Sequence, residues 1–189
     1  VWDGYKAMIG NDGSRTNREA FWEHMEGRLP VPQKEAEEIA LDFYRDDFNR
    51  AKAVTHPSLW AKKAVKAAKE NGGKVYLATN PVFPRCATEN RIRWAGLDAA
   101  DFEIITTYED CRFCKPDPRY FSDLLERFSL DPEECLMAGN DVEEDLAAAE
   151  VGISTFLVTD TMENFKNLPI RSDYQGSLQE LAGFLSMAV

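Results

Sequence analysis

Short apolar runs alternate with helix-like segments along most of the chain, and this alternation limits the folds open to it. Four runs of strand length stand out: KVYLAT (74–79), FEIIT (102–106), ECLMAG (134–139) and STFLVT (154–159). Amphipathic segments and short connections separate them. Such strand–helix alternation predicts right-handed crossovers and a parallel sheet with helices on both faces. We therefore expect an α/β fold with a three-layer, Rossmann-like core.

The first 54 residues have a different texture, because they contain helical patterns and no strong strand. TNREAFWEHMEG (16–27) begins with Thr16 and has Glu19 three residues later, the spacing of a helix capping box. PQKEAEEIALDFYRDDFNRAKAV (32–54) is a longer, partly periodic segment. The sequence therefore predicts a small all-helical domain at residues 1–54 and an α/β domain at residues 55–189.

Charge and cysteine content narrow the class of protein. The formal net charge is −11, which argues against nucleic acid and anionic membrane as partners. No apolar run approaches the ~20 residues that a membrane span needs. Cys111 and Cys114 have the spacing of half a zinc site, but no second pair accompanies them. Reduced cysteines are the favoured interpretation, and they fit a cytoplasmic protein.

Ligands of parallel α/β sheets bind beyond the carboxyl ends of the strands, so the residues that follow each apolar run are the candidates. Thr79, the loop after Thr106 and the acidic turn after Ala138 are expected to gather at one edge. The hydroxyl of Thr79 and nearby backbone N–H groups can bind anionic oxygens. The alternative is that Thr79 caps the next helix.

The segment Lys115-Pro116-Asp117-Pro118 follows the second run. Two prolines stiffen the turn, and Pro118 is well placed near the start of a helix. A stiff turn suits a cation that must point at a ligand. The alternative is a solvated surface lysine.

The acidic turn after the third run contains Asp141 and Asp145, which are four residues apart and would share a helix face. Neighbouring carboxylates repel unless a cation joins them, and Mg²⁺ is the hard cation that such oxygens suit. The alternative is favourable capping of a helix dipole, to which we assign Glu143 and Glu144. A hydroxyl, a lysine and an acidic pair after successive strands form a set suited to phosphoryl transfer.

Three segments resemble motifs of the haloacid dehalogenase-like (HAD) hydrolases, in the family's order. VYLATN, CKPDP and LMAGNDVEEDL resemble motifs two, three and four. The resemblance implies an aspartyl-phosphate intermediate, and it implies that residues 1–54 are the family's small helical cap. It also implies roles for six residues: phosphoryl binding by Thr79 with Asn80, charge neutralisation by Lys115, and Mg²⁺ binding by Asp141 with support from Asp145 and Asn140. In the cap, Asn11, Arg15 and Arg18 are candidates for substrate contact.

Motif one, the DxDxT-type sequence that carries the nucleophile, is absent from the chain. Asp3-Gly4 is the only candidate near the start, and it lacks both an apolar strand and a second aspartate. In the family this strand lies mid-sheet, and unpaired buried backbone groups cost ~1–3 kcal/mol each against a total stability of ~5–15 kcal/mol. We therefore expect the natural polypeptide to contain upstream residues with that strand, and residues 1–189 alone to be inactive.

The sequence predicts a cytoplasmic, Mg²⁺-dependent phosphomonoester hydrolase that acts on a small phosphorylated metabolite as a monomer or homodimer. One alternative is a metal-independent haloacid dehalogenase, against which the Asp141 and Asp145 pair argues. The other is a non-catalytic HAD-like binding module that has lost its nucleophile.

Overall fold

The structure, a computed structural model, describes residues 1–187. It contains two compact units, and each is assembled from two stretches of the chain. The first unit combines Val1–Lys62 with Lys74–Cys114, and the second combines Lys63–Gly73 with the residues from Lys115 onward. Within residues 1–187, no helix is both long enough and apolar enough to cross a membrane.

Helices form the start of the first unit, as the sequence predicts. The side chain of Thr16 accepts a hydrogen bond from the Glu19 backbone while the Glu19 carboxylate accepts from the Thr16 backbone, so the predicted capping box is confirmed. Gly4 lies so close to Phe21 that an added Cβ would come within 2.6 Å of the ring. The helices are α1 (Trp2–Ile9), α2 (Asn17–Met25), α3 (Gln33–Arg45) and the 3₁₀ helix η1 (Asp47–Val54).

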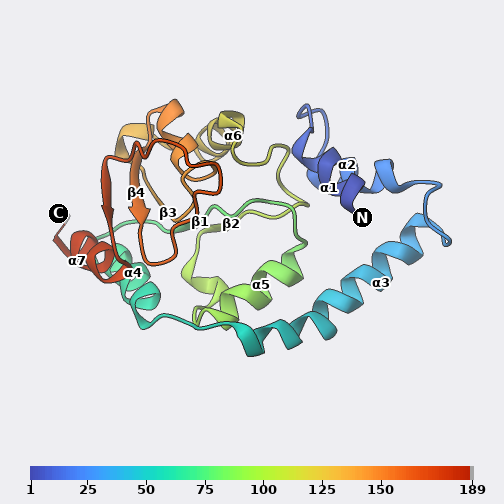
Figure 1. The fold of residues 1–189 in the computed structure, drawn as a ribbon, viewed down its shortest axis with the longest axis horizontal. Coiled ribbons are helices and arrows are strands. Elements are labelled where there is room, and N and C mark those ends of the chain that lie inside the picture. The colour runs from blue at the N-terminus through green and yellow to red at the C-terminus, as the bar shows by residue number, and fades with distance from the viewer. Residues whose placement is uncertain (188–189) are drawn as a thin grey trace. The chain divides into compact units, whose positions relative to one another are not determined.

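The long helical segment predicted at residues 32–54 is divided, because α3 ends at Arg45 and the chain continues as η1. Figure 1 shows α3 and η1 passing beside α5 (Arg85–Trp94). Aromatic rings hold these helices together: the Phe48 ring centroid lies 5.0 Å from that of Trp94, and the Tyr44 ring centroid lies 6.0 Å from that of Phe83. These ring contacts attach the helical segment to α5 and the residues before it within the first unit.

The first unit also contains a two-stranded parallel sheet. β1 (Tyr76–Leu77) pairs with β2 (Ile104–Ile105) in the register Tyr76↔Ile104, and α5 and η2 (Ala99–Asp101) connect them. The predicted apolar runs are therefore strands, although shorter than the runs. α4 (Leu59–Glu70) contains the point at which the chain leaves the first unit.

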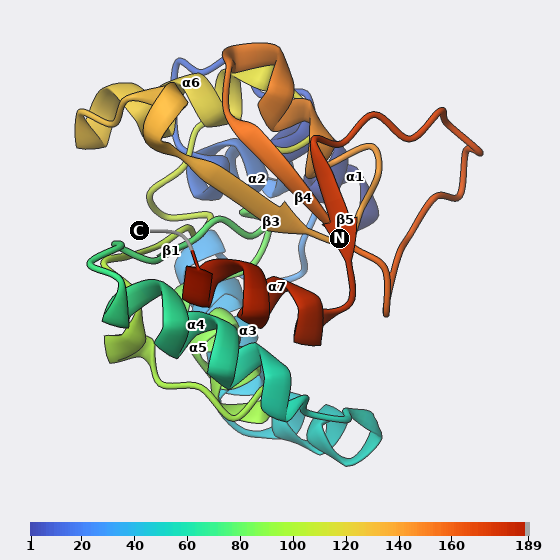
Figure 2. The same ribbon diagram turned by 90° about the vertical axis from the view of Figure 1, so that its left-hand side faces the viewer.

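The second unit contains a three-stranded parallel sheet in the order β3-β4-β5, and Figure 2 shows these strands side by side. The strands are β3 (Leu136–Gly139), β4 (Ser154–Val158) and β5 (Tyr174–Gly176). The registers are Leu136↔Ser154 and Phe156↔Tyr174. Leu157 is fully buried and packs with Val142 and Leu146 in the core of this unit. Its helices are α6 (Pro118–Phe128), η3 (Pro132–Glu134), η4 (Leu146–Val151) and α7 (Leu178–Met187).

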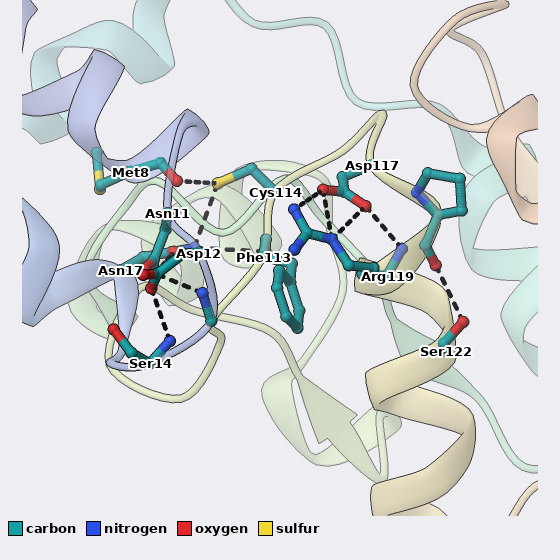
Figure 3. Close-up of polar contacts among 12 residues, drawn as sticks. Met8, Asn11, Asp12, Ser14, Asn17, Phe113, Cys114, Asp117, Arg119 and Ser122 are labelled. Carbon is teal, nitrogen blue, oxygen red and sulfur yellow. Dashed lines mark hydrogen bonds and ion pairs between the residues drawn. The ribbon is translucent and has the colours of Figure 1, made fainter.

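The start of α6 follows from its sequence. Asp117 caps the helix by accepting a hydrogen bond from the Arg119 backbone, and Pro118 occupies the first turn, where its missing N–H costs nothing. The Arg119 guanidinium also binds the Asp117 carboxylate (Figure 3), and these hydrogen bonds lower the pKa of Asp117.

One local prediction is wrong, and one strand has no counterpart among the predictions. The acidic turn, where Asp141 and Asp145 are expected to share a helix face, is a turn followed by the 3₁₀ helix η4; that helix ends at Val151, and Gly152 after it has a positive φ. β5 was not predicted, because its residues are few and partly polar. Among residues 1–187, β3 pairs only with β4, and β1 pairs only with β2. The predicted upstream strand and the boundary between residues 54 and 55 stay predictions.

Candidate active site

A buried ion pair joins two of the predicted site residues. Lys115 Nζ lies 2.5 Å from Asp145 Oδ1, and the two side chains are 5% and 9% exposed. The lysine is therefore not a solvated surface residue. A buried cation keeps its charge only when a partner compensates it, and Asp145 supplies that partner.

The second oxygen of Asp145 organises the acidic turn. Oδ2 accepts hydrogen bonds from the backbone N–H groups of Asn140 at 2.8 Å and of Asp141 at 3.0 Å. Gly139 permits this approach, since an added Cβ would lie 2.1 Å from the same oxygen. Both oxygens of Asp145 are thus committed to the lysine and the turn. Its predicted support of a metal would act through the position of the turn.

Asp141 lies at the end of β3 with one oxygen available. Its Oδ1 accepts hydrogen bonds from the backbones of Glu143 and Glu144, both at 2.8 Å. The polar contacts of this carboxylate within residues 1–187 all involve Oδ1. The remaining oxygen, Oδ2, is therefore the atom that fits a cation ligand.

Asn140 connects the turn to the loop that follows β4. The side-chain Nδ2 of Asn140 donates to the Thr161 carbonyl at 2.7 Å. The backbone carbonyl of Asn140 accepts from the backbone N–H of Glu163 at 2.8 Å. The backbone of Val142 also donates to the Glu163 carbonyl. These bonds hold the acidic turn against the loop and fix its shape.

The residues present offer Mg²⁺ one carboxylate ligand rather than a complete protein site. In the described part of the chain, no three histidine, cysteine, aspartate or glutamate side chains cluster into a metal site. Mg²⁺ is usually bound by one or two carboxylates together with water and substrate phosphate oxygens. Asp141 provides one such carboxylate.

In the first unit, Thr79 and Asn80 follow β1. The Thr106 hydroxyl donates to the carbonyls of Thr79 at 2.9 Å and of Leu77 at 3.1 Å, so the neighbouring strand fixes the backbone at this point. The residue that precedes α5 is Pro84, so Thr79 does not cap that helix and the alternative interpretation is wrong. Thr106 was not among the predicted site residues.

The three residues predicted to contact substrate from the cap each bind another protein residue in the structure. Arg18 binds Glu37 through two hydrogen bonds, which raise the pKa of Arg18, and Arg15 pairs with Glu23. Asn11 donates to Asn17 at 3.0 Å. Asn17, which the sequence analysis missed, is fully buried and bonded to two loops.

Thr79 and Asn80 belong to the first unit, whereas Lys115, Asn140, Asp141 and Asp145 belong to the second. The convergence of the two groups on one pocket therefore stays a prediction. What the structure describes is a phosphate-loop candidate in one unit and an ordered Lys–Asp turn in the other.

Most of the chain matches the sequence model of a known protein family. The family model is described as a haloacid dehalogenase-like hydrolase, and it matches residues 4–152. The chain belongs to the haloacid dehalogenase-like hydrolase family. The resemblance drawn from VYLATN, CKPDP and LMAGNDVEEDL is thereby confirmed.

Curated relatives of this HAD-like chain include two phosphatases. It is 30% identical over 148 residues to a phosphoserine phosphatase of Thermus thermophilus, covering 78% of this chain and 55% of that protein. It is 22% identical over 133 residues to the pyrophosphatase PpaX of Bacillus cereus, covering 70% of this chain and 60% of that protein. The chain spans about half the length of the curated relatives it matches.

Solved structures confirm the HAD-like α/β fold. A predicted phosphoglycolate phosphatase from Haemophilus somnus has a TM-score of 0.62 at 18% identity, with 96% of this chain and 81% of that chain covered. A HAD phosphatase from Thermococcus onnurineus has a TM-score of 0.58 at 20% identity, with 87% of this chain and 86% of that chain covered. At these identities the likeness establishes the fold.

Proposed function

We propose that the protein is a Mg²⁺-dependent phosphomonoester hydrolase that works through an aspartyl-phosphate intermediate. The buried Lys115–Asp145 pair, bonded to the turn at Asn140 and Asp141, carries this proposal. This ion pair holds the Lys115 ammonium group beside the acidic turn, and it fixes both the lysine and the turn before any ligand binds. Preorganised charge of this kind is the main contribution that proteins make to phosphoryl transfer.

Each site residue has a distinct role in the proposal. Thr79 and Asn80 bind the transferring phosphoryl group, and Lys115 neutralises the charge of the phosphate and the nucleophile. Asp141 supplies a carboxylate oxygen to Mg²⁺, which on binding would offset phosphate charge. Asn140 keeps the turn in shape through its bond to Thr161.

The nucleophile in this proposal is an aspartate outside residues 1–189. No DxD pair follows an apolar run in the sequence. The proposal includes a strand that carries this aspartate and pairs with the edge of β3 opposite β4. It also assigns residues 1–54 to a helical cap that selects the substrate and residues 55–189 to the core.

The proposed substrate is a small phosphorylated metabolite. The curated relatives are named for pyrophosphate and phosphoserine, so these two compounds are the first to test. The net charge of −11 disfavours nucleic acids and anionic membranes as partners. A cytoplasmic monomer or homodimer completes the proposal.

The decisive experiment uses the full-length natural gene product and its Lys115→Met variant. We expect Mg²⁺-dependent release of p-nitrophenol from p-nitrophenyl phosphate, abolished by EDTA and by the substitution. Halide release from 2-chloropropionate without metal would identify a dehalogenase instead. Absence of both activities in a folded protein would identify a non-catalytic module.

A further inference from the structure

Asn17 is the first residue of α2, and its side chain is fully buried. Its amide nitrogen Nδ2 lies 3.2 Å from the Pro81 carbonyl, 3.4 Å from the Phe113 carbonyl and 3.2 Å from Cys114 Sγ. Figure 3 shows this amide facing Phe113 and Cys114. One side chain of the cap thus binds two loops that are distant in sequence.

The backbone at the start of α2 strengthens the same attachment. The first N–H groups of a helix have no partner within the helix. Here the N–H of Asn17 donates to the Cys111 carbonyl and that of Arg18 donates to the Tyr108 carbonyl, both at 2.8 Å. The first N–H groups of α2 are therefore bonded to carbonyls of the segment that ends at Cys114.

A second asparagine fixes the orientation of the Asn17 amide. Asn11 is buried, and its Nδ2 donates both to Asn17 Oδ1 at 3.0 Å and to the Arg15 carbonyl at 2.9 Å. Asn11 Oδ1 in turn accepts from the Gly13 backbone. Because Asn11 must present its N–H groups to Asn17, the oxygen of Asn17 faces Asn11 and its nitrogen faces the two loops.

The turn between the two asparagines also contacts the second loop directly. Gly13 has a φ of +89°, and an added Cβ would lie 2.3 Å from the Phe113 ring. Cys114 donates from Sγ to the Met8 carbonyl at 3.7 Å. The end of α1 and the turn at residues 11–17 are therefore packed and bonded against the Phe113–Cys114 segment.

These contacts end next to the residues assigned to phosphate. Pro81 follows Thr79 by two positions, and Cys114 immediately precedes Lys115. We propose that Asn17 is a positioning residue that holds the Thr79–Pro81 loop and the segment ending at Cys114 at a fixed separation. Its catalytic importance rests on the proposed function, whereas the fixed separation does not.

Asn17→Asp tests this inference, because aspartate keeps the shape and the acceptor for Asn11 but loses the N–H donors. Asn90→Asp is the matched control. Asn90 is also buried in the first unit, and its Nδ2 donates to the Tyr44 carbonyl at 2.7 Å and to neither of the segments that Asn17 binds. The measurements are hydrogen–deuterium exchange by peptide mass spectrometry and steady-state turnover of p-nitrophenyl phosphate, both on the full-length protein.

We expect Asn17→Asp to raise exchange about tenfold or more in peptides covering residues 79–83 and 111–114, with Asn90→Asp unchanged there. We expect kcat to fall about 10- to 100-fold while KM changes little, as displaced reacting groups would produce. Unchanged exchange in both peptides would overturn the inference. Altered exchange in a protein without phosphatase activity would overturn only the proposed function.

Cys114→Ala is the second variant, in case Asn17→Asp does not fold. It removes the sulfur that accepts from Asn17 and donates to the Met8 carbonyl, and it leaves the bond from Asn17 to Pro81. We expect faster exchange at residues 111–114 and unchanged exchange at 79–83. No change at 111–114, or an equal increase throughout the first unit, would overturn the inference.

Discussion

Lys115 Nζ and Asp145 Oδ1 form a hydrogen-bonded ion pair from which solvent is nearly excluded. Asp145→Asn would remove the counter-charge that Asp145 supplies to the buried ammonium group. Removing one partner of a buried pair destabilises proteins by about 3–5 kcal/mol. We expect a loss of that size in the free energy of unfolding, measured by urea denaturation with circular dichroism.

The exposed pair between Lys166 and Glu143 provides the control for this prediction. Glu143→Gln should cost at most about 1 kcal/mol, as is usual for solvated pairs. The double substitution Lys115→Met with Asp145→Asn should recover part of the loss, since neither member of the pair is then charged. A loss in Asp145→Asn no larger than in Glu143→Gln would contradict the prediction.

Gly139→Ala should destabilise the acidic turn. Its Cβ would lie 2.1 Å from Asp145 Oδ2 and 2.3 Å from Cγ, so the carboxylate must move from its bonds. Overpacking of this kind costs about 1–3 kcal/mol. Gly183→Ala is the matched control: among residues 1–187, no heavy atom outside its two neighbours and the adjoining α7 backbone lies within 4 Å of the added Cβ, and alanine there should stabilise by about 0.5–1 kcal/mol. Thermal unfolding of both variants gives the comparison.

Asp141→Asn should weaken Mg²⁺ binding while preserving the turn. The amide oxygen can still accept from the backbones of Glu143 and Glu144, but the charge is lost. We expect the Mg²⁺ dissociation constant to rise about tenfold or more, equivalent to ~1.4 kcal/mol, by isothermal titration calorimetry on the full-length protein. The exposed residue Glu134 offers a control, as Glu134→Gln removes the same charge elsewhere. Equal affinity in the two variants would place the metal away from Asp141.

Asp173 should contribute to the acid sensitivity of the protein. The backbone N–H and hydroxyl of Thr155 donate to its carboxylate at 2.8 and 3.0 Å, and they lower its pKa below the usual 3.8. The stabilisation is present above pH 3.8 and is lost as the pH falls through the lower pKa of the folded state.

Asp173→Asn should therefore lose less thermal stability than the wild type between about pH 4 and about pH 2.5. Melting temperatures followed by circular dichroism across this range provide the test. Glu150→Gln, an exposed change, should follow the wild-type profile. Parallel profiles for Asp173→Asn and the wild type would show that this carboxylate is not linked to stability.

The sequence located the strands where apolar runs are strong, and it failed where pairing depends on distant residues. β3 and β4 lie within the runs at 134–139 and 154–159. The sequence did not predict β5, because Tyr174-Gln175-Gly176 has no local strand signal. Its alignment beside β4 follows from the register Phe156↔Tyr174, which no local pattern encodes.

In the candidate site, too, contacts between residues distant in sequence could not be predicted. Residue type and order pointed to Lys115 and Asp145, but not to the bond between them, which spans 30 positions in the chain. Asn17 was missed because its partners Pro81 and Cys114 are 64 and 97 positions away. The only local signal was an asparagine that follows the Thr16 cap at a helix start, and this position alone indicates no contact with distant loops.

The order in which the chain enters its two compact units governs how the protein can be dissected. The chain passes from one unit to the other after Lys62, after Gly73 and after Cys114. Neither unit is an uninterrupted stretch, so a single truncation cannot release either one whole. Expressing the first unit alone would require a designed linker between Lys62 and Lys74 in place of the excised residues 63–73. Limited proteolysis at one bond should accordingly leave fragments that stay associated until denaturant is added.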